Sequence, residues 1–322
     1  MKLKSITAVL LCLTLLAGFA SAVDVETVTV SSLTADNSAP VAQNISLETY
    51  RGVSVGADFQ AIDPDGDLLT YRVTTLPAKG SVNVDGAAFV YTPNAGKKGK
   101  DRFTYQAVDS EGNVSADATV SIQISKQSTD VFYPELEGSG LAYAAIRLAE
   151  AGIFTGEQVG GSYAFSEDST LTRADFLTMC AALTEMEPLR DVTRTGFSDD
   201  DSIQVWQKPY VSAALLYGVV QGSTDETGRV VFRGSSEITR AEAAVMLNGF
   251  LEISDTAGFF YTEDVPDWAA QAVANLYACD ICSGDSFRSS GLLTRGEAAE
   301  MLSAAMDVLA QRGKNKNLSW LA

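Results

Sequence analysis

The sequence predicts two folded domains, an antiparallel β-sandwich followed by a helical domain built from three repeats. Between residues 39 and 125, short segments alternate apolar and polar side chains, and turns rich in Gly and Asn separate them. Between residues 132 and 311, one five-residue motif, called the phrase below, occurs three times in similar surroundings. A period of a few tens of residues is typical of repeat proteins, so the second half is predicted to be repetitive.

Residues 1–22 have the features of a secretion signal. Two lysines precede an apolar run at residues 6–16 that is too short to span a bilayer comfortably, and small residues end the segment. We expect cleavage before Val23, and an uncleaved anchor is the alternative. Residues 23–38, rich in Thr, Ser and Val, are expected to form a flexible lead-in.

The composition excludes several classes of partner and of enzyme. Without the two lysines of the signal, the chain has 41 acidic and 21 basic residues, a net charge of −20. This charge argues against nucleic acid and against an anionic membrane as partners, so no membrane contact is expected after cleavage. The chain has no His, which excludes Ser-His-Asp and Cys-His catalysis and His-ligated metals. A hydrolase that uses a carboxylate pair passes this test.

Three Cys follow the signal. Cys279 and Cys282 have the spacing of a zinc or redox motif. No His and no second Cys pair exist to complete a zinc site, so both, like Cys180, are predicted to be buried structural residues.

The predicted sandwich strands have alternate apolar residues. Such positions are Leu69, Tyr71 and Val73, then Phe103, Tyr105 and Ala107, and then Val120, Ile122 and Ile124. Each strand would bury one face, and two sheets would bury those faces against each other.

The same region resembles bacterial Ig-like, cadherin-like modules. The resemblance rests on the segments Asn37–Val41, Asp63–Tyr71, Lys79–Val82, Phe89–Pro93 and Asp101–Tyr105. It implies an extracellular spacer or adhesive unit over residues 39–125, whose partner the sequence does not identify.

Some of these modules bind calcium through acidic residues at strand ends. Here Asp63, Asp65 and Asp67 place three carboxylates at alternate positions, which makes calcium a candidate cofactor and the only one. The alternative is a solvated Asp-Gly turn.

After a polar linker at residues 126–131, the helical half is organised by the repeated phrase. Its copies are Leu171–Asp175, Ile238–Glu242 and Leu293–Glu297. A Thr followed three residues later by an acid is a capping box, so each copy is predicted to start a helix. The Arg after each Thr lies at the wrong end of the helix dipole, which indicates another task.

The surroundings of the phrase repeat as well. A Phe stands seven residues before each Thr, and a helix stop precedes it at Gly152, Gly218 and Asp280. Asp is one of the few residues that tolerate the left-handed conformation of such a stop. Trp206 and Trp268 lie equally far upstream of the second and third stops.

These features resemble S-layer homology (SLH) repeats, at residues 132–190, 191–255 and 256–311, with a tail at 312–322. The resemblance implies an all-α, pseudo-threefold domain that binds polymers of the bacterial cell wall. In the family, Trp and acidic residues join the motif Arg in grooves between repeats, and the ligand is often a secondary wall polysaccharide with pyruvate ketals. The candidate binding residues are Arg173, Arg240, Arg295, Trp206, Trp268, Asp199 and Asp264.

Each candidate has a structural alternative. The Trp residues could be packing residues, and the Arg residues could form salt bridges between repeats. Against this, Arg matches a carboxylate with a bidentate fork and lies beside helix N-termini that favour anions. Arg240 and Arg295 are expected to contribute more than Arg173, because their repeats keep the Trp and the upstream Asp.

The sequence therefore predicts a secreted, non-enzymatic protein of the bacterial cell surface. Its SLH repeats would bind secondary cell wall polysaccharide non-covalently, and its Ig-like module would be displayed. The alternatives are a carboxylate-dependent hydrolase of wall glycan and a small S-layer subunit.

Overall fold

The computed structural model describes residues 37–254, 265–283 and 286–318, with side chains to residue 313. The predicted signal, most of the lead-in, the end of the tail and Asp264 lie outside these residues. Within them, no helix combines the length and apolar character needed to cross a membrane.

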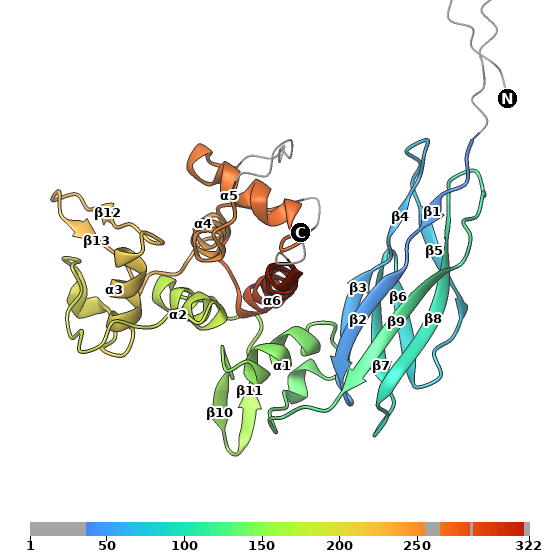
Figure 1. The fold of residues 1–322 in the computed structure, drawn as a ribbon, viewed down its shortest axis with the longest axis horizontal. Helices are drawn as coiled ribbons and strands as arrows, with labels where there is room; N and C mark the ends of the chain where they lie inside the picture. The colour runs from blue at the N-terminus through green and yellow to red at the C-terminus, as the bar shows by residue number, and fades with distance from the viewer. Residues whose placement is uncertain (1–36, 255–264, 284–285, 319–322) are drawn as a thin grey trace, which may run out of the picture. The chain divides into compact units, whose positions relative to one another are not determined.

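The first half is a sandwich of two sheets (Figure 1). One sheet has the order β2 (Ile45–Tyr50), β9 (Ala118–Ser125), β8 (Gly99–Val108) and β5 (Thr70–Thr75). The other has the order β3 (Val55–Asp58), β7 (Ala88–Pro93) and β6 (Gly80–Asp85), and β1 (Val41–Ala42) pairs with β4 (Ala61–Ile62). All pairs are antiparallel except β2 with β9, which is parallel. The prediction of a purely antiparallel sandwich was therefore wrong at this one pair.

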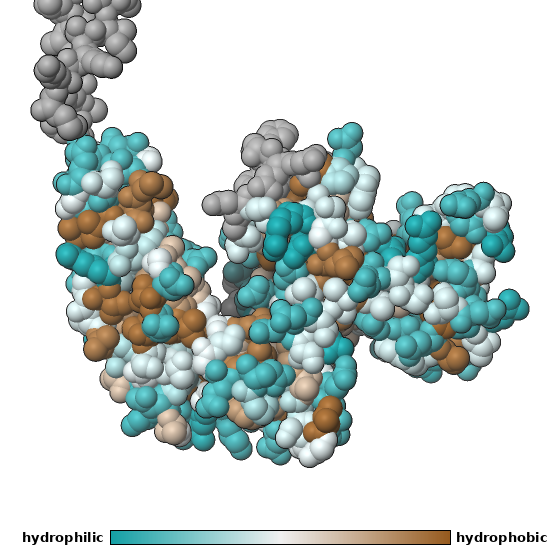
Figure 2. Space-filling model, turned by 180° about the vertical axis from the view of Figure 1, so that it is seen from behind, coloured by the Kyte–Doolittle hydropathy of each residue, from teal (hydrophilic) through white to brown (hydrophobic). Residues whose placement is uncertain are grey.

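The alternating residues of the central strands form the sandwich core, as predicted. Phe103, Tyr105 and Val120 have no exposed surface. Tyr71 and Val73 on β5 are only half-buried, because β5 is an edge strand. Apolar side chains also gather on the outer surface of the sandwich (Figure 2). Exposed apolar side chains in this half include Val41, Ile62, Leu68 and Leu76.

The second half contains helices and two small β-ribbons. The helical elements are η1 (Pro134–Leu136), α1 (Ala142–Glu150), α2 (Arg173–Leu183), η2 (Asp200–Ser202), α3 (Lys208–Leu216), α4 (Arg240–Leu251), α5 (Asp267–Ala278) and α6 (Arg295–Leu318). The ribbons pair β10 (Glu157–Val159) with β11 (Ser162–Ala164) and β12 (Ser223–Thr224) with β13 (Val230–Val231). The expectation of an all-α half was therefore too strict. Glycines with positive φ at 160, 161 and 228 form the tight turns that allow these loops to pair.

The helix starts and stops agree with the sequence pattern. Helices α2, α4 and α6 each begin at the Arg of a phrase copy, and Thr239 with Glu242 forms a complete capping box. The predicted stops have left-handed backbones, with φ of 70° at Gly152, 73° at Gly218 and 55° at Asp280. Asp280 therefore takes the conformation that its two Gly counterparts take.

The three phrase copies are joined in a closed ring of main-chain hydrogen bonds. Leu171 N donates to Leu293 O at 3.2 Å, Leu293 N to Ile238 O at 2.9 Å, and Ile238 N to Leu171 O at 2.9 Å. All three side chains are buried in the apolar core of the helical half. Each copy thus both donates to one neighbour and accepts from the other.

The polar linker is held against α1. Both carboxylate oxygens of Glu150 accept hydrogen bonds, from Ser128 N at 2.7 Å and from Thr129 N at 2.7 Å. Burial raises the pKa of Glu150, but the hydrogen bonds from Ser128 and Thr129 outweigh it and lower this pKa to about 2. The linker is therefore fixed to the helix at neutral pH.

Candidate functional site

Each motif Arg reaches from its own helix start into the neighbouring phrase copy or loop. Arg173 Nη1 lies 3.0 Å from Glu242 Oε1, and Arg240 Nε donates to Glu297 Oε1 at 3.1 Å. Arg295 Nη2 lies 3.0 Å from Glu157 Oε1. The three Arg side chains are only 13–17% exposed. The geometry of a salt bridge between repeats, the alternative to ligand binding, is therefore present at all three positions.

Two of these Arg residues also line grooves that contain a Trp. The first, here the Trp206 groove, has a volume of about 350 Å³ and is lined by Trp206, Arg295, Ile153, Phe154, Asp175, Thr178, Met179, Leu171 and Tyr210. The second, here the Trp268 groove, has about 620 Å³ and includes Trp268, Arg173, Val219, Val220, Glu242, Val245 and Met246.

The two grooves are built from equivalent positions of the repeat. In each, a Trp from one copy faces the apolar pair and second helix of the copy before it. The Arg comes from the remaining copy, so all three contribute. Asp175 in one groove corresponds to Glu242 in the other, and Met179 corresponds to Met246. Because similar residues recur at equivalent positions of different copies, both grooves follow from the repeat pattern of the chain.

The two Trp residues are exposed rather than packed. Trp206 is 55% exposed and Trp268 is 60% exposed. Trp206 Nε1 donates to Gln204 Oε1 at 2.6 Å, which fixes the indole beside its groove. An exposed indole with a fixed orientation offers a flat apolar face to a ligand.

One nitrogen of the Arg295 guanidinium, the buried Nε, has no hydrogen-bond partner among the described residues. The carboxylate partner of Arg295, Glu157, is 65% exposed, so this ion pair is weak. The guanidinium carbon lies 5.4 Å from the centre of the Phe154 ring, which holds the group at the groove wall. Arg173 lies similarly 5.5 Å from the Phe232 ring, but it is paired with Glu242 inside its own groove.

The lining of the grooves favours a different ranking of the Arg residues from the predicted one. Arg240 was expected to rank with Arg295 because its own repeat contains a Trp. The structure pairs each Arg with a Trp from a different copy, Arg295 with Trp206 and Arg173 with Trp268. Arg240 lines neither groove.

The helix-start amides are also not available for an anion. Arg173 N donates to Ser236 O at 2.9 Å, Arg240 N to Gly291 O at 2.8 Å and Arg295 N to Ser169 O at 2.8 Å. Loop carbonyls of the neighbouring copy thus satisfy the groups that an unpaired helix start would offer. An anion in a groove would rely on the Arg side chain.

Asp199 has a structural position. Its carboxylate accepts hydrogen bonds from Phe232 N at 2.8 Å and from Arg233 N at 2.7 Å, and it lines neither groove. In the first copy, Glu135 accepts from Phe165 N and Ser166 N in the same way. The prediction that Asp199 binds polymer finds no contact in either groove.

The candidate calcium site has a different third member from the one predicted. Ligand oxygens of Asp63, Asp67 and Asp109 lie within 4.8 Å of one another. Asp65 points elsewhere and accepts a hydrogen bond from Ser38 N at 2.7 Å. Asp63 Oδ2 is buried without a hydrogen-bond partner in the described part of the chain, which suits a cation ligand. Asp109 could not be found from the sequence, because it precedes a separate turn.

The pKa of Asp109 agrees with a site that stays ionised. Burial, the largest influence, raises it, but hydrogen bonds from the side chain and backbone of Asn113 and from other turn amides together lower it below its usual value. An ionised carboxylate is the form that binds a hard cation.

We predict that calcium stabilises the sandwich through these three residues. At a concentration a hundredfold above Kd, binding to the folded state adds about 2.7 kcal/mol, which calorimetry would register as a rise in Tm of several degrees. Asp67→Asn should abolish the rise, and Asp65→Asn, the matched control, should keep it. A calcium-independent Tm in the unaltered chain would show that the acids form a plain turn.

The described Cys residues are free thiols. Cys180 is completely buried, and burial raises its pKa well above the usual value. Burial likewise raises the pKa of Cys282 to about 12, so this thiol stays protonated at neutral pH. These environments agree with the predicted structural role of both residues, and Cys279 is partly buried against the same core.

Comparisons with known families support both halves. Residues 37–123 match the bacterial Ig domain family, and residues 196–244 match the S-layer homology domain family. A bacterial Ig domain followed by an S-layer homology domain indicates a protein of the cell surface, associated with the cell wall.

Two curated relatives share parts of the chain. It is 28% identical over 127 residues to the surface-layer 125 kDa protein of Lysinibacillus sphaericus, which covers 39% of this chain and 10% of that protein. It is 28% identical over 149 residues to an amylopullulanase of Thermoanaerobacterium thermosulfurigenes, which covers 43% of this chain and 8% of the enzyme. The chain thus spans a tenth or less of the length of these relatives.

Solved structures show only distant similarity. The SrpA adhesin from Streptococcus sanguinis aligns with 40% of this chain and 86% of its own, at 17% identity and a TM-score of 0.25. Human mucin-like protocadherin EC1-2 aligns with 28% of this chain and 54% of its own, at 20% identity and a TM-score of 0.22. TM-scores this low have no bearing on function.

Proposed function

We propose that this protein attaches non-covalently to the bacterial cell wall by binding a carboxylate-bearing wall polysaccharide in the Trp206 and Trp268 grooves. In this proposal all three phrase copies belong to S-layer homology repeats with pseudo-threefold symmetry. The Ig-like sandwich is carried as the displayed module. The observation that supports the proposal best is the repetition of one groove, with an exposed Trp and a mostly buried Arg, at two equivalent places.

The chemistry of the grooves suits an acidic sugar. A pyranose ring packs its apolar face on an aromatic side chain, and the two exposed indoles provide such a face. A ketal-linked pyruvate carries a carboxylate, for which a guanidinium is the best-matched side chain. In the Trp206 groove the ligand carboxylate would compete for Arg295 with Glu157, which is 65% exposed. In the Trp268 groove the ligand would have to compete with Glu242 for Arg173.

The grooves do not suit a glycosidase. Cleavage of a glycosidic bond uses two carboxylates about 5–9.5 Å apart. Among the described residues, the Trp206 groove contains one acid, Asp175, and the Trp268 groove contains one, Glu242. Asp175 already accepts a hydrogen bond from Gln207, and Glu242 is paired with Arg173. The function proposed for these two grooves is therefore binding without hydrolysis.

The proposal is tested by co-sedimentation of the purified chain, from residue 23, with bacterial wall sacculi. We expect binding to intact sacculi and its loss once mild acid has stripped the secondary polysaccharide from the peptidoglycan. Unchanged binding to stripped sacculi would refute a polysaccharide ligand. Sedimentation without any sacculi would favour the alternative of a self-assembling S-layer subunit.

A further inference from the structure

The third copy of the groove differs from the other two at the position of the Trp. Trp206 and Trp268 each lie twelve residues before the left-handed helix stop, at Gly218 and Asp280. Twelve residues before the remaining stop, Gly152, stands Gly140. The groove that Arg240, Glu297 and the start of α6 would complete therefore has no aromatic platform.

Gly140 instead contacts the sandwich. Gly56 N on β3 donates to Gly140 O at 3.2 Å, and a Cβ on either Gly would come within 3.0 Å of the Cα of the other. The two backbones approach so closely only because both residues are Gly. A Trp at position 140 could not coexist with this contact.

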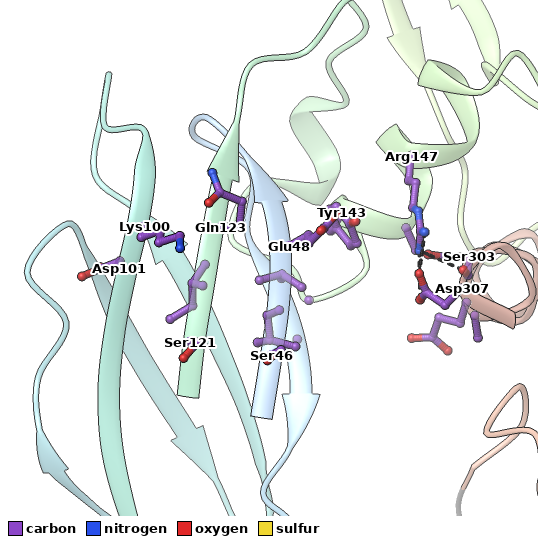
Figure 3. Close-up of a pocket in the computed structure, with 18 of the residues that line it drawn as sticks. Ser46, Glu48, Lys100, Asp101, Ser121, Gln123, Tyr143, Arg147, Ser303 and Asp307 are labelled. Carbon is purple, nitrogen blue, oxygen red and sulfur yellow. Dashed lines mark hydrogen bonds and ion pairs between the residues drawn. The ribbon is translucent and has the colours of Figure 1, made fainter. Parts of the chain in front are cut away.

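Further contacts join the sandwich to the helical half beside Gly56 and Gly140. Together with that contact they form the surface called the seam below. Tyr143 N, in the first turn of α1, donates to Ser54 O at 3.1 Å, and the rings of Tyr50 and Tyr143 lie 5.7 Å apart. Val53, on the sandwich, is 4% exposed and belongs to the apolar core of the helical half. On the helical side, α1 is held to α6 because Arg147 donates to Ser303 and Asp307 (Figure 3).

The charge beside the seam disfavours an anionic polymer. A hollow of about 680 Å³ lies between β3 and the start of α6, and its acidic lining consists of Asp58, Glu167, Asp168, Asp280, Glu297 and Glu300. No Lys or Arg occurs among the described residues of this lining. Burial, and then Glu297, Glu167 and Asp58, raise the pKa of Glu300, which reflects the concentration of negative charge.

We propose that the sandwich of the same chain occupies the third groove, through the contact between Gly56 and Gly140. This groove then does not bind wall polymer. The two halves then form one mechanical unit, and a chain has two polymer sites. The number of polymer sites per chain rests on the proposed function, whereas the docking of the sandwich in the third groove does not.

Hydrogen exchange of the full mature chain tests the docking without any ligand. The amides of Gly56 and Tyr143 donate across the seam, and Tyr143 N, in the first helical turn, has no partner within its own helix. We expect both amides to be protected. Gly140→Trp should accelerate the exchange of both amides, and Gly56→Val that of Tyr143, at least about tenfold, while amides of β8 and α4 stay protected. Gly196→Ala is the matched control, because its Cβ would meet only Leu215 at an ordinary 3.8 Å.

Two outcomes would overturn the proposal. One is exchange of both seam amides in the unaltered chain at the rate of exposed loop amides. The other is retention of full protection in both variants.

Titration with soluble polysaccharide released from sacculi then counts the binding sites. We expect two sites per chain, and three would contradict the assignment of the third groove. Protected seam amides in a chain that binds no polysaccharide would refute the proposed function and leave the docking standing.

Discussion

Replacing Trp206 and Trp268 together by Ala is expected to abolish co-sedimentation with wall sacculi. Each indole is more than half exposed at the edge of its groove, so its removal takes away the apolar platform with little loss of packing. Aromatic anchors of binding sites commonly contribute about 2 kcal/mol or more, and two sites on one polymer reinforce each other. Each single replacement should weaken binding about tenfold to a hundredfold, with Tm nearly unchanged.

The same assay separates the Arg residues. Arg295→Ala should weaken binding by about 1.5–3 kcal/mol, the range for a hydrogen bond to a charged group. Tyr217→Ala is a suitable control for the Trp replacements, because Tyr217 is also an exposed aromatic residue, at 64% exposure, and lines neither groove. Equal binding by the double Trp variant and by this control would place the polymer site elsewhere on the chain.

Replacing Arg240 by Ala is expected to reduce stability and to leave wall binding intact. Arg240 is 13% exposed and joins α4 to Glu297 at the start of α6. Among the described residues, removing it leaves Glu297, 28% exposed, with the exposed Arg288 at 3.6 Å and a hydrogen bond from Thr294 N at 3.1 Å. The loss of charged hydrogen bonds predicts a fall of about 1.5–3 kcal/mol in the free energy of unfolding. Urea denaturation of the full chain would measure it.

The control for this prediction is a surface ion pair. Arg229 is 65% exposed and pairs with Asp225 within one loop, so Arg229→Ala should cost less than about 1 kcal/mol. Adding Glu297→Gln to Arg240→Ala should cost little more than Arg240→Ala alone, because the two residues share one interaction. Losses that are equal for Arg229→Ala and Arg240→Ala, or that add fully with Glu297→Gln, would contradict a coupling between copies.

The sequence predicted local features well. Thr239 and Glu242 lie three residues apart, and a capping box depends on that spacing alone. The left-handed stop at Asp280 followed in the same way from its alignment with two Gly residues. Alternation along β8 and β9 predicted buried positions, but it carries no information on strand direction, so the parallel pairing of β2 with β9 was missed.

The composition of the grooves could be predicted only in part. The sequence identified Trp206, Trp268 and the three Arg residues as candidates, but a repeat pattern does not show which copy faces which. The predicted ranking therefore judged each Arg by the Trp of its own copy, whereas each groove in the structure combines an Arg and a Trp from different copies. Asp109 was missed for a related reason, since its approach to Asp63 depends on the packing of distant turns.

The ring formed by Leu171, Ile238 and Leu293 limits how this architecture can evolve. In open solenoids, the end repeats keep a free face, so duplication can lengthen the array. Here the third copy closes on the first, and every donor and acceptor of the ring is already used. A fourth copy would have no edge to join without opening the ring. A chain that needs a stronger hold on its wall would therefore have to acquire a second complete trio of copies.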